Sequence, residues 1–120
     1  MVSQIKAIDA VLIDTQFPER LVSFYRDSLG IPLKEETHGS PVHWSCFLNG
    51  VYFSIHRVDR SGAHLSNVHF SLLVDSIDAI VEYLRTKNEL NLEMAPTDRP
   101  FGKLASIRDP DGNLIYLHSE

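Results

Sequence analysis

The chain of 120 residues has little of what would place it in a specialised class of protein. Its single cysteine, Cys46, cannot form an internal disulfide, and its apolar surroundings in "WSCFL" indicate a core thiol. Acidic residues outnumber basic ones by 16 to 11, and no basic cluster marks a nucleic-acid partner. No apolar run approaches the roughly 20 residues that span a bilayer. Asp9 and Asp14 interrupt the N-terminal apolar stretch, which disfavours a secretion signal and favours a cytoplasmic protein.

The first half of the chain contains signals for a strand, a helix and a hairpin. Residues 7–15 are β-branched and apolar, which is typical of a strand. Pro18 suits the first turn of a helix and Gly30 its end. Between them, apolar residues recur at helical spacing: Leu21, Phe24, Tyr25 and Leu29. Asn49-Gly50, between two apolar runs, predicts a hairpin whose turn needs positive φ.

The second half repeats this order. A strand at 68–75 precedes a helix that Asp75 or Ser76 caps, and an extended piece and a hairpin through residues 109–112 follow. The sequence therefore predicts strand–helix–strand–strand–strand twice, at about 5–57 and 67–118, in one domain of residues 1–120. Anchoring the halves on their hairpin turns aligns Ser54 with Tyr116, and His56 with His118.

Two motifs, "FYRDSLG" in the first half and "RDPDGN" in the second, make the chain similar to a known family. It resembles the vicinal oxygen chelate superfamily, which includes glyoxalases, bleomycin-resistance proteins and extradiol dioxygenases. The resemblance implies an α+β fold in which two βαβββ modules form a curved, cup-like mixed sheet with the helices on its outer side. It also implies a small-molecule ligand and a homodimer. A ferredoxin-like βαββαβ sandwich is the alternative fold, and the two hairpins argue against it.

Metal-dependent members of this family place ligands at four strand positions. The resemblance carries these positions to Ala10, Ser54, His69 and Tyr116, and only His69 is a common metal ligand. We therefore expect no metal in the usual family arrangement and no other cofactor. A divalent metal stays possible at a rearranged site of His56, His69 and His118.

Alternation along the strands puts several polar side chains on the cup face. His69 and Tyr116 are the candidate acid–base pair, or else recognition contacts. Further candidates for ligand binding are Ser54, His56, His118, Trp44 and Arg99. The alternative role for Trp44 is packing in or beside the core. The alternative for Arg99 is a solvated side chain in a surface loop. Phe47 and Phe53 are expected to pack against helices.

Three functions remain open at this point. The cup binds an aromatic or mostly apolar small molecule without metal, or it is a lyase, isomerase or dioxygenase with a rearranged metal site, or the fold is a dimerisation module without chemistry. The sequence leaves open whether the protein is an enzyme; a glyoxalase-like lyase or a dioxygenase-like activity would be the expected kinds.

Overall fold

The structure is a computed structural model that describes residues 8, 10–37, 41–59 and 69–120. The first module runs β1 (Ala10–Thr15), α1 (Pro18–Val22), the π-helical turn η1 (Ser23–Ser28), β2 (Lys34–Glu36), β3 (His43–Leu48) and β4 (Val51–Arg57). The second runs β5 (Phe70–Leu73), α2 (Ile77–Thr86), β6 (Leu92–Arg99), β7 (Gly102–Arg108) and β8 (Leu114–Ser119). The repeated βαβββ unit is confirmed.

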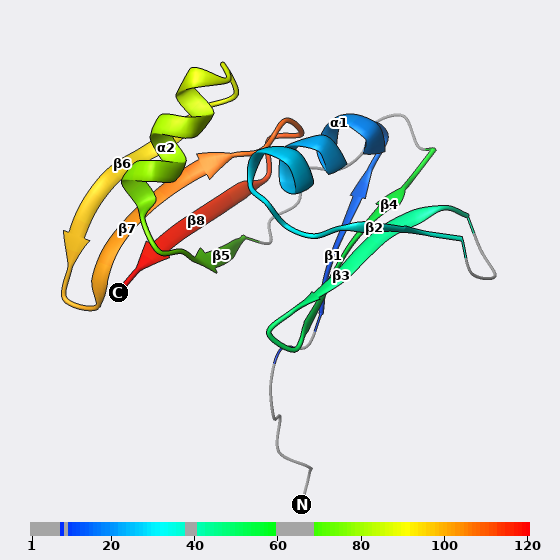
Figure 1. The fold of residues 1–120 in the computed structure, drawn as a ribbon, viewed down its shortest axis with the longest axis horizontal. Coiled ribbons are helices and arrows are strands. Elements are labelled where there is room, and N and C mark those ends of the chain that lie inside the picture. The colour runs from blue at the N-terminus through cyan, green and yellow to red at the C-terminus, as the bar shows by residue number, and fades with distance from the viewer. Residues whose placement is uncertain (1–7, 9, 38–40, 60–68) are drawn as a thin grey trace, which may run out of the picture.

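Each module forms its own four-stranded sheet, in the orders β1-β4-β3-β2 and β5-β8-β7-β6. The first strand of each module pairs in parallel with the last, and the hairpin strands pair antiparallel. The two curved sheets lie side by side without closing, and both helices lie on the same side of them (Figure 1). The α+β prediction is confirmed, with two sheets in place of one. The ferredoxin-like alternative is wrong, because three strands follow each helix.

The helices begin where the sequence predicts. Pro18 stands in the first turn of α1, and Gly30 follows η1 with a φ of 78°. Within η1 the consecutive side chains of Phe24 and Tyr25 are both buried. At the start of α2 the hydroxyl of Ser76 accepts a hydrogen bond from the backbone N–H of Ala79 at 3.1 Å. No helix in the described ranges is long and apolar enough to cross a membrane.

The two hairpin turns differ in length but both use left-handed backbone. Asn49 and Gly50 have φ values of 48° and 87°, as a type I′ turn requires. In the second turn the N–H of Gly112 donates to the carbonyl of Asp109 at 2.9 Å, and the N–H of Asp109 donates to the carbonyl of Asn113 at 3.0 Å. The tight turn predicted at residues 109–112 is therefore present.

One hydrophobic core extends through both modules, beneath the helices. Phe53 is buried in it as expected, and Trp44 and Cys46 pack against it from β3. Burial raises the pKa of the Cys46 thiol. The expectation for Phe47 is wrong: its side chain is 70% exposed, because alternation along β3 turns it away from the helices.

The turn of the second module is bonded to the first module. The Tyr25 hydroxyl donates to the buried carboxylate of Asp109 at 2.7 Å. Asp111 accepts hydrogen bonds from the Thr15 hydroxyl and, at 2.6 Å, from the Arg20 guanidinium. These contacts join the "RDPDGN" turn to β1, α1 and η1.

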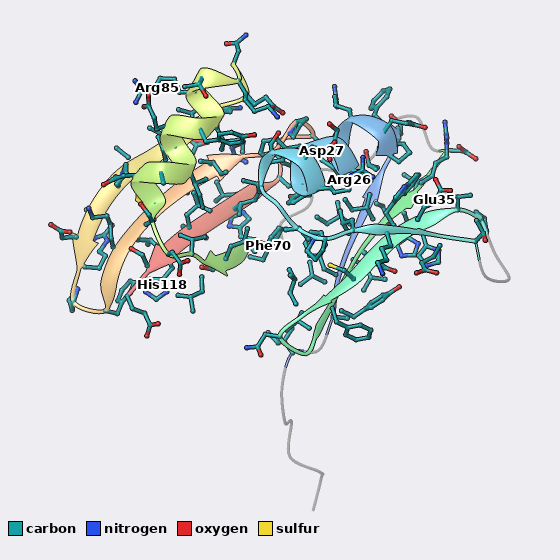
Figure 2. All side chains as sticks on the ribbon, viewed as in Figure 1. Arg26, Asp27, Glu35, Phe70, Arg85 and His118 are labelled. Carbon is teal, nitrogen blue, oxygen red and sulfur yellow. The ribbon has the colours of Figure 1, made fainter. Side chains whose placement is uncertain are left out.

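Aromatic packing reinforces the same junction. The ring of Phe53 on β4 lies 5.9 Å from that of Phe70 on β5, which is labelled between the modules in Figure 2. The Tyr25 ring lies 5.3 Å from Phe53 and 6.3 Å from Phe70. Such pairs stabilise beyond the burial of their area. Polar and apolar contacts thus meet at Tyr25.

Removing a core side chain from either helix should destabilise the fold. Phe24→Ala and Leu84→Ala each delete a fully buried side chain, so we expect each to lower the free energy of unfolding by about 2–5 kcal/mol through lost transfer energy and a cavity. Chemical denaturation measures this, with Tyr83→Ala on the exposed side of α2 as the control. A cost well below 1 kcal/mol at Phe24 or Leu84 would contradict the packing.

Tyr25→Phe removes the hydroxyl that donates to Asp109, and we expect a loss of about 1–3 kcal/mol in the free energy of unfolding. Tyr83→Phe, at a half-exposed tyrosine, is the matched control.

The same variant should change the alkaline limit of stability. Burial, and then the charge of Asp109, raise the pKa of Tyr25 well above its ordinary value. The stabilisation is therefore complete below the unfolded tyrosine pKa of about 10 and is lost as the pH rises further. Unfolding curves above about pH 10 should fall more steeply for the natural protein than for Tyr25→Phe. Equal slopes would refute a buried, neutral Tyr25.

Candidate functional site

Each sheet has one face covered by its helix and one open face. On the first sheet, alternation sorts the open-face side chains into three rows that run across the strands. The apolar row is Ala10, Tyr52 and Phe47. The hydroxyl row is Leu12, Ser54, Ser45 and Lys34. The ionisable row is Asp14, His56, His43 and Glu36.

The apolar end of this face is unusually exposed. Phe47 is 70% exposed and its ring centroid lies 5.2 Å from that of Tyr52. Leu12, in the next row, is 59% exposed. Large apolar side chains grouped in this way make this end of the face a candidate binding surface.

The other end of the face contains a stacked pair of histidines. The rings of His43 and His56 lie 4.9 Å apart and are nearly parallel. Nε2 of His56 is 2.8 Å from Oγ of Ser54, which is fully buried. Burial lowers the pKa of His56, and the neighbouring His43 lowers it further, while the charge of Asp14 opposes both. At neutral pH the His56 ring is therefore uncharged.

The open face of the second sheet centres on Tyr116. Its neighbours across the strands are Ser71 and Ser106. The ring of His69, just before β5, lies 6.3 Å from that of Tyr116, and no direct hydrogen bond joins them in the described structure. At this distance the two tilted rings are in aromatic contact, so His69 and Tyr116 present their polar atoms from one cluster.

His118 continues this face towards its outer end (Figure 2). Its Nε2–H donates to the carbonyl of Phe101 at 3.2 Å, and its ring lies 5.4 Å from the Phe101 ring. Leu73, beside His118 in the parallel pair, is 66% exposed. The second face therefore also combines aromatic, aliphatic and polar groups.

The strand registers agree with the alignment of the two halves. Ser54 and Tyr116 each stand opposite a serine of their hairpin, Ser45 and Ser106 respectively. His56 and His118 follow two residues later on the same faces.

The four positions implied by the family metal site fall into two pairs. Ala10 and Ser54 are on the open face of the first sheet, and His69 and Tyr116 on that of the second. Ala10 has no donor atom, and the Ser54 hydroxyl is buried against His56. The residues present thus do not fit the usual metal. In the described ranges, no three His, Cys, Asp or Glu side chains are placed to hold a metal ion. Of the rearranged candidates, His69 and His118 share one sheet and His56 belongs to the other.

Two further candidates lie apart from these faces. Trp44 is on the helix side of β3, packed against the core, which favours its structural role. Arg99 stands at the β6–β7 turn with its guanidinium 3.9 Å from the sulfur of Met94. It lines a surface hollow of about 520 Å³ together with acidic and basic side chains, among them Asp78, Asp98 and Lys103. Tyr116 and His69 do not line this hollow.

The open-face residues that were not among the predicted site residues include Asp14, His43, Phe47 and Tyr52. The Asn49-Gly50 turn contained a signal for three of them. A two-residue turn fixes the register, so Phe47 must face Tyr52 and His43 must face His56. Asp14 joins them through the parallel pairing of β1 with β4, which no local motif specifies.

Solved structures with the same fold cover almost the whole chain. TnmS3, an antibiotic binding protein from Streptomyces sp. CB03234, is 21% identical with a TM-score of 0.73, and the alignment covers 98% of each chain. TioX from Micromonospora sp. ML1 is 16% identical with a TM-score of 0.70, covering 95% of this chain and 98% of TioX. A superfamily member from Sphaerobacter thermophilus DSM 20745 is 20% identical with a TM-score of 0.74, covering 97% of this chain and 98% of its own.

No curated protein sequence matches the chain closely enough to count as a relative. A family model, however, matches residues 7–117, nearly the full length of the chain. The chain therefore belongs to the Glyoxalase/Bleomycin resistance protein/Dioxygenase superfamily.

Proposed function

We propose that this protein binds an aromatic or mostly apolar small molecule on the open faces of its sheets, without a metal ion. The observation that carries the proposal is Phe47, which is 70% exposed and paired with Tyr52 on a face that no helix covers. Ligand sites combine apolar and aromatic walls with a few placed polar groups. His69, Tyr116 and His56 supply such polar groups on the two faces.

The donor chemistry supports the absence of a metal from this function. A divalent ion needs several imidazole or anionic ligands together. Alanine, a buried serine and a tyrosine occupy three of the four positions that the family uses. TnmS3, which has a similar fold, is an antibiotic binding protein, and binding without turnover is the activity that we propose here.

The His69–Tyr116 pair supports a second candidate, acid–base catalysis on the bound molecule. The two rings are in contact, so an imidazole and a phenol hydroxyl are close enough to act on one group of a bound molecule. Glyoxalase-like lyase chemistry would use the pair in this way. Turnover of a bound ligand that is lost in both His69→Ala and Tyr116→Phe would favour this candidate over binding alone.

We also propose that two copies associate through their open faces. Leu12, Phe47 and Leu73 are all more than half exposed, and they lie on two faces of one chain. Bringing the first sheet of one copy against the second sheet of its partner would bury them and turn two open faces into an enclosed site. A homodimer thus supplies the cup that two unclosed sheets lack.

Binding can be tested with 2-naphthylmethanol, a fused-ring probe without charge. We expect calorimetry to show binding that is unchanged after treatment with a chelator. Phe47→Ala should weaken it about tenfold, since contact with one aromatic ring contributes on the order of 1 kcal/mol. Tyr116→Phe should weaken it if the hydroxyl contacts the ligand, without changing the melting temperature.

Controls for this experiment come from the same chain. Phe17→Ala removes another exposed phenylalanine and Tyr83→Phe another exposed hydroxyl, each on a helical segment. Both should bind as the natural protein does. Stoichiometric zinc, iron, nickel or manganese that is lost in His69→Ala, together with loss of binding after chelation, would overturn metal-independent binding.

The dimer is tested by light scattering on purified protein. The expected mass is about twice the 13.6 kDa of one chain. Leu12→Lys should shift the protein towards monomers because it places a charge on the open face, whereas Tyr83→Lys on α2 should not. A monomer at high micromolar concentration would contradict association through these faces.

A further inference from the structure

The open face of the first sheet changes in character from one end to the other. The apolar row, with Phe47 and Tyr52, lies at the tip of the hairpin. The ionisable row lies four residues further along each strand, and the hydroxyl row separates the two. A ligand that extends along the strands would have its apolar part at one end and its polar part at the other.

The ionisable row is continuous across all strands of this sheet. Asp14 on β1 stands beside His56 on β4, His56 opposite His43 on β3, and His43 opposite Glu36 on β2. Directly paired side chains on one face lie within about 5 Å of each other at Cβ. Two carboxylates therefore flank two imidazoles in one line.

The row carries negative charge at neutral pH. Its two carboxylates supply that charge, and on the described part of this face Lys34 of the hydroxyl row is the cation beside it. The imidazole of His56 adds no charge at neutral pH, because burial holds its pKa below the ordinary value. Among the described residues, the ionisable groups that pair with the two histidines across the strands are Asp14 from β1 and Glu36 from β2.

We propose that the ionisable row recognises the positively charged end of the ligand, an amine or related cation, whose apolar part lies on Phe47, Tyr52 and Leu12. This inference rests on the proposed function and names the class of ligand: a cationic amphiphile with an aromatic body. Asp14 and Glu36 attract the cation, and the stacked rings of His43 and His56 lie between these two carboxylates.

Three naphthalene probes of one shape test this proposal: 2-naphthylmethylamine, 2-naphthylmethanol and 2-naphthoate. In calorimetry at about pH 7.5, we expect the amine to bind roughly three- to tenfold more tightly than the alcohol, as one partly exposed ion pair allows. The carboxylate should bind more weakly than the alcohol. Asp14→Asn with Glu36→Gln should remove the preference and leave the affinity for the alcohol unchanged.

Glu35→Gln is the matched control, because Glu35 is adjacent to Glu36 on β2 but lies opposite Trp44 on the other face. It should keep the preference for the amine. If the double variant has a lowered melting temperature, the single variants Asp14→Asn and Glu36→Gln replace it, and each should lose part of the preference.

The outcomes separate this proposal from the function on which it rests. If the alcohol binds at the face that contains Phe47 but the amine has no advantage, the cationic ligand class is wrong and the proposed function stands. If no probe binds, the proposed function itself fails. A preference for the amine that persists in Asp14→Asn with Glu36→Gln also overturns the role of the row.

Discussion

The buried carboxylate of Asp109 connects the two modules because it bonds to both of them. It accepts a hydrogen bond from the Tyr25 hydroxyl of the first module. Within its own turn it accepts further hydrogen bonds from the backbone N–H groups of Asp111 and Asn113 and from the side-chain amide of Asn113. A buried charge is costly unless such donors surround it, so the turn and η1 must dock together for either to be stable. Burial, and then the charge of Asp109, raise the pKa of Tyr25, so its hydroxyl stays protonated and can donate to this carboxylate. This contact determines how the rest of the molecule is arranged.

Docking at this point uses the helix side of both sheets and leaves their other sides open. Phe53 and Phe70 extend the junction as apolar contacts, and the core beneath the helices is continuous from one module to the other. The contacts between the modules described above come from the helix side of the sheets, and none of them uses an open-face side chain. This division explains how exposed Phe47 and Leu73 coexist with a well-packed core. The contacts that stabilise the fold lie on the helix side of the sheets, and the candidate site lies on the open side.

Local signals in the sequence predicted the elements well. The Asn49-Gly50 turn also specifies the register of its hairpin, and that register places Phe47 on the open face. Pro18, Ser76 and the Asn49-Gly50 pair marked starts and turns that the structure contains, because capping and positive φ depend on neighbouring residues alone. The position predicted for Phe47 was wrong because the register of its hairpin, and not its aromatic character, determines which face of the sheet it occupies. Other features are not local. The parallel pairing that places Asp14 beside His56, and the separation of the sheets, depend on contacts between distant segments. The resemblance supplied the arrangement that local patterns could not.

The acidic residues of the "RDPDGN" motif join the two modules in this chain. Asp109 and Asp111 are occupied by Tyr25, Thr15 and Arg20, and the strand that follows presents Tyr116 where the resemblance implies a ligating carboxylate. The first sheet has a matching change, with Ala10 and a buried Ser54 at the corresponding positions. Carboxylates and imidazoles are instead gathered in the ionisable row, two residues beyond Ser54 on β4 and four residues beyond Ala10 on β1. The polar groups of this face thus lie further along the strands than the positions that the resemblance implies for a metal site.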